Sequence, residues 1–359
     1  MTGQDGGRVA APDGRGAGQQ GSGGRFLRWG VLGGARIAEH FVLPAMAGCP
    51  QARVTAVASR RPDAAERLAR DHGARPYGSY AALLDDPRVD AVYVALPNAL
   101  HTRWTLAALA AGKHVLCEKP LATTAADAQA VAQAAAAAGR VVRAGYMYRC
   151  HPQFAELRRQ VREGVVGEVH MVEAALSFVL DDPSDIRMSP ALGGGALLDL
   201  GCYPVDAANV VFGRSPAGAA AVPYVGATGV DVHSSGVLDY GGGRTALVTA
   251  SFLLPWQDSH LTVRGEKGSL VLDHCFNPGT GEGRMTRLTA DGERTVTTFP
   301  GVDMYARMLA DFSAAVHGEP GVLPDPVQSL GVQRGLELLA GQGPNAGTTA
   351  PVHSTRQDR

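Results

Sequence analysis

The sequence predicts an α/β fold in which a doubly wound parallel sheet precedes an α/β domain with an open, mainly antiparallel sheet. Three observations predict it. Strand and helix patterns alternate to about residue 145, which is typical of βα units. From Gly167 onward the strand patterns are separated by turns rather than by helices. A length of 359 residues also exceeds what one hydrophobic core usually supports.

The composition limits the partners that we expect. The formal net charge is −1, and Lys and Arg are spread along the chain, which excludes the electrostatic footprint of a protein that binds nucleic acid or an anionic membrane. No segment approaches the ~18 consecutive apolar residues that a membrane span needs. Small molecules and other subunits are therefore the expected partners.

The five cysteines show no Cys-x-x-Cys spacing and stand mostly in apolar runs. This pattern predicts buried, reduced thiols in a cytoplasmic protein. The sequence has no His-Glu-x-x-His motif and no cluster of Cys and His, so we expect no metal.

Composition divides the chain into four segments. Residues 1–24 hold nine glycines and no apolar stretch of a secretory signal, which predicts a disordered leader. Residues 25–145 form the first expected domain, and residues 146–342 form the second. Residues 343–359 are expected to form a flexible tail.

The first strand pattern, Arg28 to Leu32, runs into a glycine-rich turn and an apolar helical pattern. Gly33 would let the main chain approach a pyrophosphate, Ala35 would keep helix and strand close, and the first amides of the helix would face the anion. An ordinary turn is the alternative for this stretch alone. The candidate cofactor contacts here are Gly30, Gly33, Ala35, Arg36 and Ile37.

The second strand pattern, at 53–58, ends in Ser59, Arg60 and Arg61. In dinucleotide-binding folds this position contacts the adenosine ribose, where an acid binds the 2′-hydroxyl of NAD and an arginine accommodates the 2′-phosphate of NADP. Since no acid is present, we expect NADP. A solvated loop is the alternative for the two arginines.

Strand and helix patterns continue to alternate to residue 144. Leu96, Pro97 and Asn98 end one strand where a nicotinamide would lie, and His101 opens the next helix. These four residues are candidate cofactor contacts, although a histidine that merely stands near a helix start is an equal alternative for His101. Helices are expected at 62–72, 79–85, 102–110 and 124–138, and strands near 75 and at 89–95, 113–117 and 140–144.

The strand at 113–117 presents Glu118, Lys119 and Pro120 from its carboxyl end, where open α/β sheets bind their ligands. Lys119 is expected beside the nicotinamide. Glu118 is expected to orient the turn and contact the nicotinamide ribose, with a solvated loop acid as the alternative.

In the second part, the segment 193–209 reads as one helix on which Asp199, Tyr203 and Asp206 share a face. A polar stripe on an apolar helix indicates a site, and a buried hydrogen-bonded network is the alternative. Strands are expected at 168–180, 219–225, 234–240, 244–254, 260–264, 269–273 and 285–299, and helices at 153–162, 303–316 and 324–339.

The ordered motifs resemble those of the glucose-fructose oxidoreductase, inositol dehydrogenase and MocA (Gfo/Idh/MocA) family. This resemblance implies an N-terminal Rossmann domain, a C-terminal domain whose open sheet commonly supports dimers or tetramers, and a catalytic Lys119. It extends from about Arg28 to the closing helices. The matching motifs are Gly30-x-x-Gly33-x-Ala35-x-Ile37-Ala38, Leu96-Pro97-Asn98 with His101, Glu118-Lys119-Pro120, Met147-Tyr148-Arg149 with His151-Pro152, and Gly193-Gly-Gly-Ala-x-x-Asp199-x-Gly201-x-Tyr203.

Many members of that family place a histidine where this chain has Tyr203. The chain is therefore less similar to the inositol-dehydrogenase-like branch than to the branches of sugar 3-ketoreductases, aldose dehydrogenases, dihydrodiol dehydrogenases and glucose-fructose oxidoreductase. Tyr203 is the expected general acid in reduction, Lys119 is expected to polarise the substrate oxygen, and Asp199 is expected to orient one of them. The roles of Tyr203 and Lys119 can be exchanged. An ammonium beside the phenol would favour its ionisation.

The resemblance implies an NADP(H)-dependent sugar oxidoreductase. The first expectation is reduction of a nucleotide-linked keto-deoxysugar, such as a dTDP-3-keto-6-deoxysugar, in deoxysugar and antibiotic biosynthesis. The alternatives are a D-xylose-like aldose 1-dehydrogenase, a dihydrodiol dehydrogenase and a non-enzymatic NADP sensor. Arg149, Asp185 and Arg187 are the candidate substrate contacts, and the two arginines would either hold a diphosphate or form ion pairs.

Overall fold

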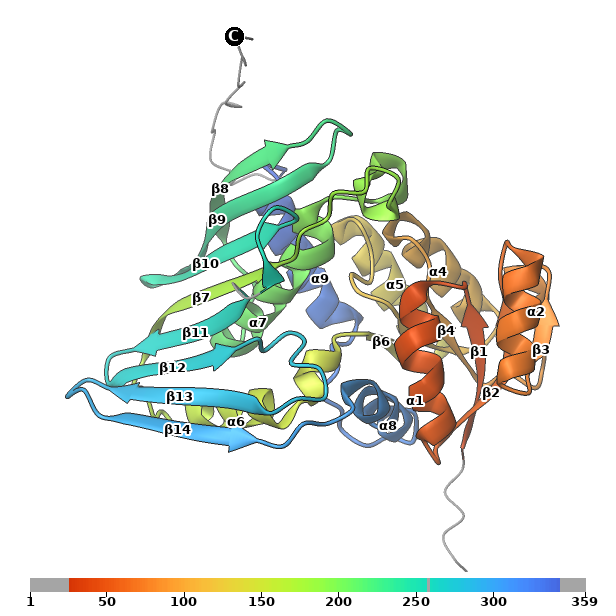
Figure 1. Cartoon of the computed structure of the whole chain (residues 1–359), viewed down its shortest axis with the longest axis horizontal. Coiled ribbons are helices and arrows are strands. Elements are labelled where there is room, and N and C mark those ends of the chain that lie inside the picture. Colours follow the sequence, from red (N-terminus) through yellow and green to blue (C-terminus); the bar gives the residue numbers. More distant parts are fainter. Residues whose placement is uncertain (1–25, 257–258, 343–359) are drawn as a thin grey trace, which may run out of the picture.

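The computed structural model describes residues 26–256 and 259–342. The expected leader, 1–24, and the expected tail, 343–359, lie outside these residues. Two sheets dominate the chain, as predicted, and Figure 1 shows them side by side with helices between them. The predicted fold class is confirmed.

The first sheet has six parallel strands in the order β3-β2-β1-β4-β5-β6. β1 lies between β2 and β4, so the order of the strands runs outward from β1 in both directions. Open sheets bind their ligands at the carboxyl ends of the strands beside such a switch point. The strands are β1 (Leu27–Leu32), β2 (Ala52–Ala58), β3 (Arg75–Tyr77), β4 (Ala91–Val94), β5 (His114–Cys117) and β6 (Val142–Ala144).

The helices of this first part begin and end close to where the sequence predicts. Thr124 caps α5 by accepting a hydrogen bond from the amide of Asp127 at 3.1 Å, and Gly139 ends that helix in the left-handed conformation. The helix after β1 differs from the expectation, since it widens into a π-helical turn at Ala38–Val42. The helices are α1 (Leu43–Gly48), α2 (Pro62–Asp71), α3 (Tyr80–Leu84), α4 (His101–Ala110) and α5 (Ala125–Ala138).

The second sheet has eight strands in the order β14-β13-β12-β11-β7-β10-β9-β8. Only β7 and β10 pair in parallel, and the other neighbours are antiparallel, as expected for this part of the chain. The strands are β7 (Val169–Ser177), β8 (Gly218–Val225), β9 (Asp231–Gly241), β10 (Arg244–Ser251), β11 (His260–Gly265), β12 (Gly268–Asp273), β13 (Gly283–Thr289) and β14 (Arg294–Phe299).

The prediction of one long strand at 285–299 is wrong, because β13 and β14 form a hairpin in its place. The turn between them is stabilised by Thr289, whose hydroxyl contacts Asp291 and accepts a hydrogen bond from the Glu293 amide at 3.0 Å. Gly292 supplies the positive φ that the turn needs. A Thr-x-Asp-Gly sequence inside a strand pattern is the signal for such a turn.

Helices cover one face of the second sheet, where α7 packs on β7 and α9 packs on β8. The opposite face carries exposed Leu247, Val237 and Val222 on neighbouring strands. The helices are α6 (Pro152–Arg162), α7 (Cys202–Phe212), α8 (Met304–Val316) and α9 (Pro326–Leu339).

The two parts of the chain are joined through α9, which packs on α5 of the first part. Glu337 accepts a hydrogen bond from the Ala125 amide at 2.7 Å, and the buried ring of Trp29 lies 5.0 Å from that of Phe312 on α8. All five cysteines are buried and unpaired, as predicted. Among the described residues, no helix combines the length and the apolar character that crossing a membrane demands.

Candidate active site

A cavity of about 1160 Å³ lies where the two parts meet, and both contribute to its wall. This volume exceeds the range of ~300–1,000 Å³ that is typical for a single small ligand, so the cavity has room for more than one. The predicted site residues that line it are Gly33, Ala35, Arg36, Ile37, Ser59, Arg60, Arg61, Leu96, Pro97, Asn98, His101, Glu118, Lys119, Asp185, Arg187, Asp199 and Tyr203.

The two glycines that were predicted to contact the cofactor, Gly30 in β1 and Gly33 in the turn after it, have different roles. Gly33 has a φ of 108°, and a Cβ there would lie 2.2 Å from the carbonyl oxygen of Ala95, so the turn passes β4 only without a side chain. Gly30 does not line the cavity. A Cβ on Gly30 would lie 2.5 Å from Leu83, so this glycine lets α3 pack on β1 and is not placed to contact a cofactor.

The carboxyl end of β2 forms the other wall of the cofactor region. Ser59 is buried, and its hydroxyl accepts a hydrogen bond from the Arg61 amide at 3.2 Å. The Arg61 guanidinium donates to the Gly34 carbonyl at 3.2 Å, which spans the two loops. Arg60 is exposed, and its guanidinium has no hydrogen-bond partner among the described residues. A buried hydroxyl beside a free guanidinium suits a phosphate.

His101 joins two loops of the first part. Its ring nitrogens lie 2.7 Å from the carbonyl oxygens of Leu96 and Pro120. With both nitrogens occupied by main chain, His101 positions the turn that carries Lys119. Asn98 reaches across to the second part and donates to the Gly193 carbonyl at 2.9 Å.

Glu118 is not a solvated loop acid. It is buried, and the hydroxyl of the fully buried Tyr93 donates a hydrogen bond to its Oε1 at 2.5 Å. Burial raises the pKa of Glu118, and Tyr93 only partly opposes this effect. The hydrogen bond fixes the start of the turn at the carboxyl end of β5.

Lys119, Asp199 and Arg187 form a continuous chain of charges across the cavity. The Lys119 ammonium donates to Oδ1 of Asp199 at 2.8 Å and to its main-chain carbonyl at 3.0 Å. Arg187 Nε donates to Oδ2 of Asp199 at 3.0 Å. Burial disfavours ionisation of Asp199, but the two cations outweigh it and lower the pKa of that carboxyl. Burial likewise opposes the Lys119 ammonium, and Asp199 outweighs it, so the pKa of Lys119 is raised.

Tyr203 faces Lys119 with its ring rather than with its hydroxyl. The ammonium nitrogen lies 5.2 Å from the ring centroid, within cation–π distance. The hydroxyl lies 3.6 Å from Sδ of Met147, which is a weak acceptor. The expected stabilisation of phenolate does not hold in this geometry, because burial raises the pKa of Tyr203 well above its usual range.

The predicted single helix with three polar residues on one face is wrong. A π-helical turn at Leu197–Gly201 precedes α7, and its wider i→i+5 winding rotates the following residues relative to a regular helix. Asp199 and Tyr203 face the cavity. Asp206 is fully buried outside it and accepts a hydrogen bond from Tyr148 at 2.6 Å.

Arg149, a predicted substrate contact, lies outside the cavity as well. Its guanidinium donates to both carboxylate oxygens of Asp206, at 2.5 and 2.8 Å, and to the Val322 carbonyl at 3.1 Å. Arg149 therefore forms an ion pair, which was the alternative to substrate binding. Arg187 likewise forms ion pairs with Asp199 and Asp185. All three guanidinium nitrogens of Arg149 are engaged, whereas Nη2 of Arg187 has no hydrogen-bond partner among the described residues.

Several cavity residues were not recognised in the sequence as site residues. Phe178, Phe276, Asn277 and Tyr305 line the side that belongs to the second part. Trp256 lines it too. Aromatic residues at strand ends and in loops carry no spacing signal, so only the tertiary structure brings them to one cavity.

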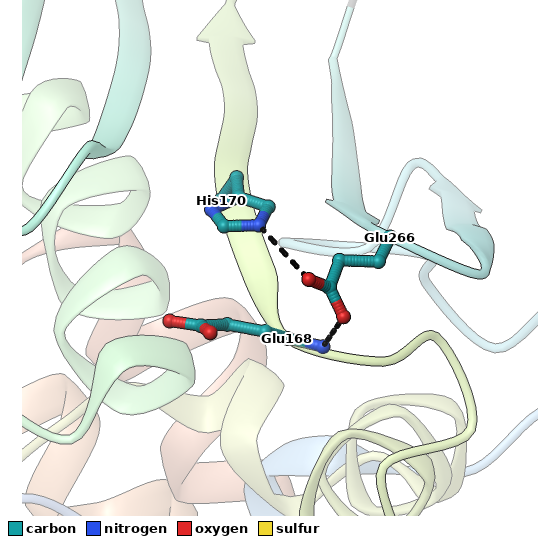
Figure 2. Close-up of side chains that lie close together, drawn as sticks. All are labelled: Glu168, His170 and Glu266. Carbon is teal, nitrogen blue, oxygen red and sulfur yellow. Dashed lines mark hydrogen bonds and ion pairs between the residues drawn. The ribbon is translucent and has the colours of Figure 1, made fainter.

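Figure 2 shows three neighbouring residues of metal-ligating type, Glu168, His170 and Glu266. Glu168 and His170 lie at the start of β7, and Glu266 lies in the turn after β11. All three are exposed and none lines the cavity. Glu266 contacts His170 Nε2 at 3.9 Å and accepts from the Glu168 amide at 3.4 Å. These contacts describe a local arrangement at the surface, in which one carboxylate lies beside an imidazole and a main-chain amide.

Comparisons with known proteins agree with this architecture. Residues 27–146 match the model of an oxidoreductase family with an NAD-binding Rossmann fold, and residues 154–271 match a GFO/IDH/MocA C-terminal domain. A D-xylose 1-dehydrogenase (NADP(+)) of Haloferax volcanii is 36% identical over 87% of this chain and 96% of its own. A dTDP-3,4-didehydro-2,6-dideoxy-alpha-D-glucose 3-reductase of Actinomadura kijaniata is 35% identical over 81% of this chain and 87% of its own.

Among solved structures, a 3-ketoreductase from Actinomadura kijaniata in complex with NADP and TDP-benzene superposes with a TM-score of 0.82 at 33% identity, covering 88% of this chain and 97% of that one. Variants of that ketoreductase with a tyrosine replaced by phenylalanine, or a lysine by alanine, are similar in structure as well. With both family models matched and relatives above 30% identity over most of its length, this chain is an oxidoreductase that belongs to the Gfo/Idh/MocA family.

Proposed function

We propose that this protein is an NADP(H)-dependent sugar oxidoreductase that interconverts a carbonyl and a carbinol group. The observation that carries the proposal is the chain of charges formed by Lys119, Asp199 and Arg187 beside Tyr203, in a cavity that also contains the glycine-rich turn. Proton-handling groups at a dinucleotide site serve hydride transfer to or from an oxygen-bearing carbon.

The residues present fit NADP. Gly33 gives main-chain access for a pyrophosphate, and the helix that follows offers the free amides of its first turn. Ser59 and Arg60 supply a hydroxyl and an uncommitted guanidinium for a 2′-phosphate. When bound, the nicotinamide supplies or accepts the hydride. The two relatives that name a cofactor, the xylose dehydrogenase and the solved ketoreductase, both name NADP.

Lys119 and Tyr203 handle the charge and the proton at the substrate oxygen. An ammonium has three donors, and two of those on Lys119 are directed to Asp199, so the third is left for the substrate oxygen. The raised pKa of Lys119 keeps it positive where negative charge develops in reduction.

Tyr203 is the proposed proton donor. Its hydroxyl is neutral, and a thioether contact to Met147 is readily exchanged for a hydrogen bond to a substrate oxygen. In the ketoreductase of known structure, the replaced lysine and the replaced tyrosine are separated by the same interval as Lys119 and Tyr203. This equal spacing supports paired roles.

Two substrate classes share this chemistry. The names of several relatives favour a dTDP-linked keto-deoxysugar, which would place the protein in deoxysugar and antibiotic biosynthesis. The name of the xylose dehydrogenase favours a free aldose oxidised at its first carbon. A sensor without catalysis would not need the charged chain at Lys119, and membership of an oxidoreductase family also favours an enzyme.

We further propose a homo-oligomer assembled through the face of the second sheet that carries no helices. Exposed apolar side chains on neighbouring strands there, including Leu247, Val237, Val222 and Tyr224, would gain from burial against a second copy.

The test is a steady-state assay that follows NADPH at 340 nm with two panels, free sugars and a dTDP-linked keto-sugar. We expect saturable turnover with at least one sugar and a strong preference for NADPH over NADH. Cofactor binding without turnover of any carbonyl or carbinol compound would favour the sensor and contradict the proposal.

A further inference from the structure

Tyr305 is the residue at which the first turn of α8 reaches the cavity wall. Asp303 caps this helix and accepts hydrogen bonds from the amides of Tyr305 at 2.9 Å and Ala306 at 3.0 Å. α8 packs on α1 of the first part and on the π-helical turn before it (Figure 1). The cap and this packing fix the place where Tyr305 enters the wall.

The hydroxyl group of Tyr305 is not used within the protein. It has no hydrogen-bond partner among the described residues, and its oxygen is not shut off from solvent. Because the side chain as a whole is only 8% exposed and the residue lines the cavity, the hydroxyl is reached from the cavity. Burial and the nearby charge of Glu118 raise the pKa of Tyr305, so the phenol is neutral and able to donate a hydrogen bond.

Phe41 and Glu118 show which part of the cavity Tyr305 faces. Phe41 lines the cavity from the π-helical turn that follows the glycine-rich turn, and its ring centroid lies 5.3 Å from that of Tyr305, a distance typical of aromatic pairs. Glu118 follows β5, whereas Arg60 follows β2, on the other side of β1 in the sheet. Tyr305 therefore lies near the glycine-rich turn and Glu118, and away from the proposed site of the adenosine 2′-phosphate.

We infer that Tyr305 is a cofactor-binding residue that the second part supplies, with its hydroxyl donating a hydrogen bond to an oxygen of the diphosphate and ribose that lead to the nicotinamide. Phe41 holds the ring of Tyr305 in place. The inference rests on the proposed NADP site and concerns binding alone. An unpartnered hydroxyl beside a bound diphosphate gains a charge-assisted hydrogen bond, so the second part adds to the affinity for the cofactor.

The experiment compares the native chain with Tyr305→Phe, which keeps the ring on Phe41 and removes only the hydroxyl. Equilibrium titrations use NADPH, 2′-phospho-ADP-ribose and adenosine 2′,5′-bisphosphate. We expect the first two ligands to bind roughly tenfold more weakly to the variant, as is usual when one hydrogen bond to a charged group is lost. The affinity for adenosine 2′,5′-bisphosphate, which lacks the diphosphate and the second ribose, should not change.

Tyr224→Phe is the matched control, because Tyr224 is exposed on β8 and does not line the cavity. It should leave all three affinities unchanged. Equal affinity of Tyr305→Phe and the native chain for NADPH would overturn the inference. Equal weakening of all three ligands, with a lower melting temperature of the cofactor-free variant, would also overturn it, since this result describes a general loosening of the fold.

Phe41→Leu tests whether the ring of Phe41 acts through Tyr305. We expect this variant to weaken NADPH binding by less than Tyr305→Phe does, because the hydroxyl is misplaced but still present. The double variant should bind NADPH about as weakly as Tyr305→Phe alone, since the two side chains act as one unit. If the two losses add in full, Phe41 does not position Tyr305.

Failure of the inference is distinguishable from failure of the proposed function. If the native chain binds NADPH and Tyr305→Phe binds it equally well, the inference is wrong and the proposed cofactor site stands. If the native chain does not bind NADPH, the proposed function is wrong as well. A lower turnover of Tyr305→Phe with unchanged affinity for NADPH would assign the hydroxyl to the reaction and overturn its role in binding.

Discussion

Asp199 and Asp206 stand on one helical segment seven residues apart, yet they face opposite surroundings. Asp199 receives Lys119 and Arg187 at the cavity, and Asp206 receives Arg149 in the core. The π-helical turn between residues 197 and 201 separates their directions. Substitution at Asp199 should therefore act mainly on activity, and substitution at Asp206 should act on stability.

Asp206→Ala should destabilise the protein by roughly 3–5 kcal/mol, because it leaves the buried Arg149 guanidinium without its counter-ion. The measurement is urea denaturation followed by circular dichroism. Turnover per folded molecule should stay within a few-fold of the native value, since neither residue lines the cavity. Asp199→Asn should instead cause a strong loss of turnover, and because the amide oxygen can still accept a hydrogen bond from Lys119, it should cost less stability than Asp206→Ala does.

Lys119→Ala should lower kcat by roughly 10²- to 10⁴-fold, the range typical of a lost proton-handling group. The Kd for NADPH, followed by fluorescence quenching, should change by less than about fivefold, since the proposed anchors of the phosphates lie at Gly33 and Ser59. Lys267→Ala, in the turn before β12, is the control for a lost lysine elsewhere.

Tyr203→Phe keeps the ring beneath the Lys119 ammonium and removes only the hydroxyl. We expect a fall in kcat of a size similar to that of Lys119→Ala, with unchanged thermal stability. If Tyr203→Phe retains near-native turnover while Lys119→Ala does not, the lysine is the proton donor and the proposed roles are exchanged.

Asp231 gives a dependence of stability on pH. Its carboxylate accepts a hydrogen bond from the Leu197 amide at 2.6 Å, and burial raises its pKa to about 6. Because the folded state holds this proton more tightly than the unfolded state, the contribution of Asp231 to stability is most favourable below the unfolded pKa, near ~4, and is lost as pH rises to about 6.

Asp231→Asn keeps an acceptor for the Leu197 amide and removes the buried charge. At pH 7.5 the variant should therefore exceed the native protein in unfolding free energy by about 1–2 kcal/mol, and near pH 4 this advantage should vanish. Thermal melts across pH 4–8 test it. An equal difference at all pH values would assign the effect to packing.

Arg60→Ala should weaken NADPH binding by roughly 10- to 100-fold, because one charge-assisted contact to the 2′-phosphate is lost. The affinity for NADH, which lacks that phosphate, should change by less than about threefold. Arg70→Ala, on α2 and outside the cavity lining, controls for the change in surface charge.

Leu247→Glu on the helix-free face of the second sheet should shift the protein toward smaller species in size-exclusion chromatography with light scattering. The reason is that a carboxylate would be buried in the proposed interface between copies. An unchanged mass, equal to that of a monomer in both proteins, would remove the proposed oligomer.

Local patterns in the sequence were sufficient to bring several predicted residues of the first part to the cavity wall. Gly33 directly follows β1 and Lys119 is the second residue after β5, and parallel strands bring their carboxyl ends to one edge. The position of such residues depends mainly on neighbours in sequence, so the pattern is sufficient to place them.

The second half depends on distant contacts, and there the sequence was less informative. Asp206 and Arg149 look like site residues in a motif, and only the partner across the core shows that they are structural. The π-helical turn that separates Asp199 from Asp206 has no spacing signature. Phe276 and Tyr305 reach the cavity from the segment after β12 and from α8, which no local pattern could place together.

The position of His101 bears on how a protein of this kind can acquire a new substrate specificity. Its two ring nitrogens contact the carbonyls of Leu96 and Pro120, so His101 holds the loop after β4 against the turn that carries Lys119. The alignment of the reacting groups is thus set within the first part of the chain. The aromatic wall at Phe178 and Trp256 can then change by substitution to admit new sugars, and new specificities can evolve without rebuilding the chemistry.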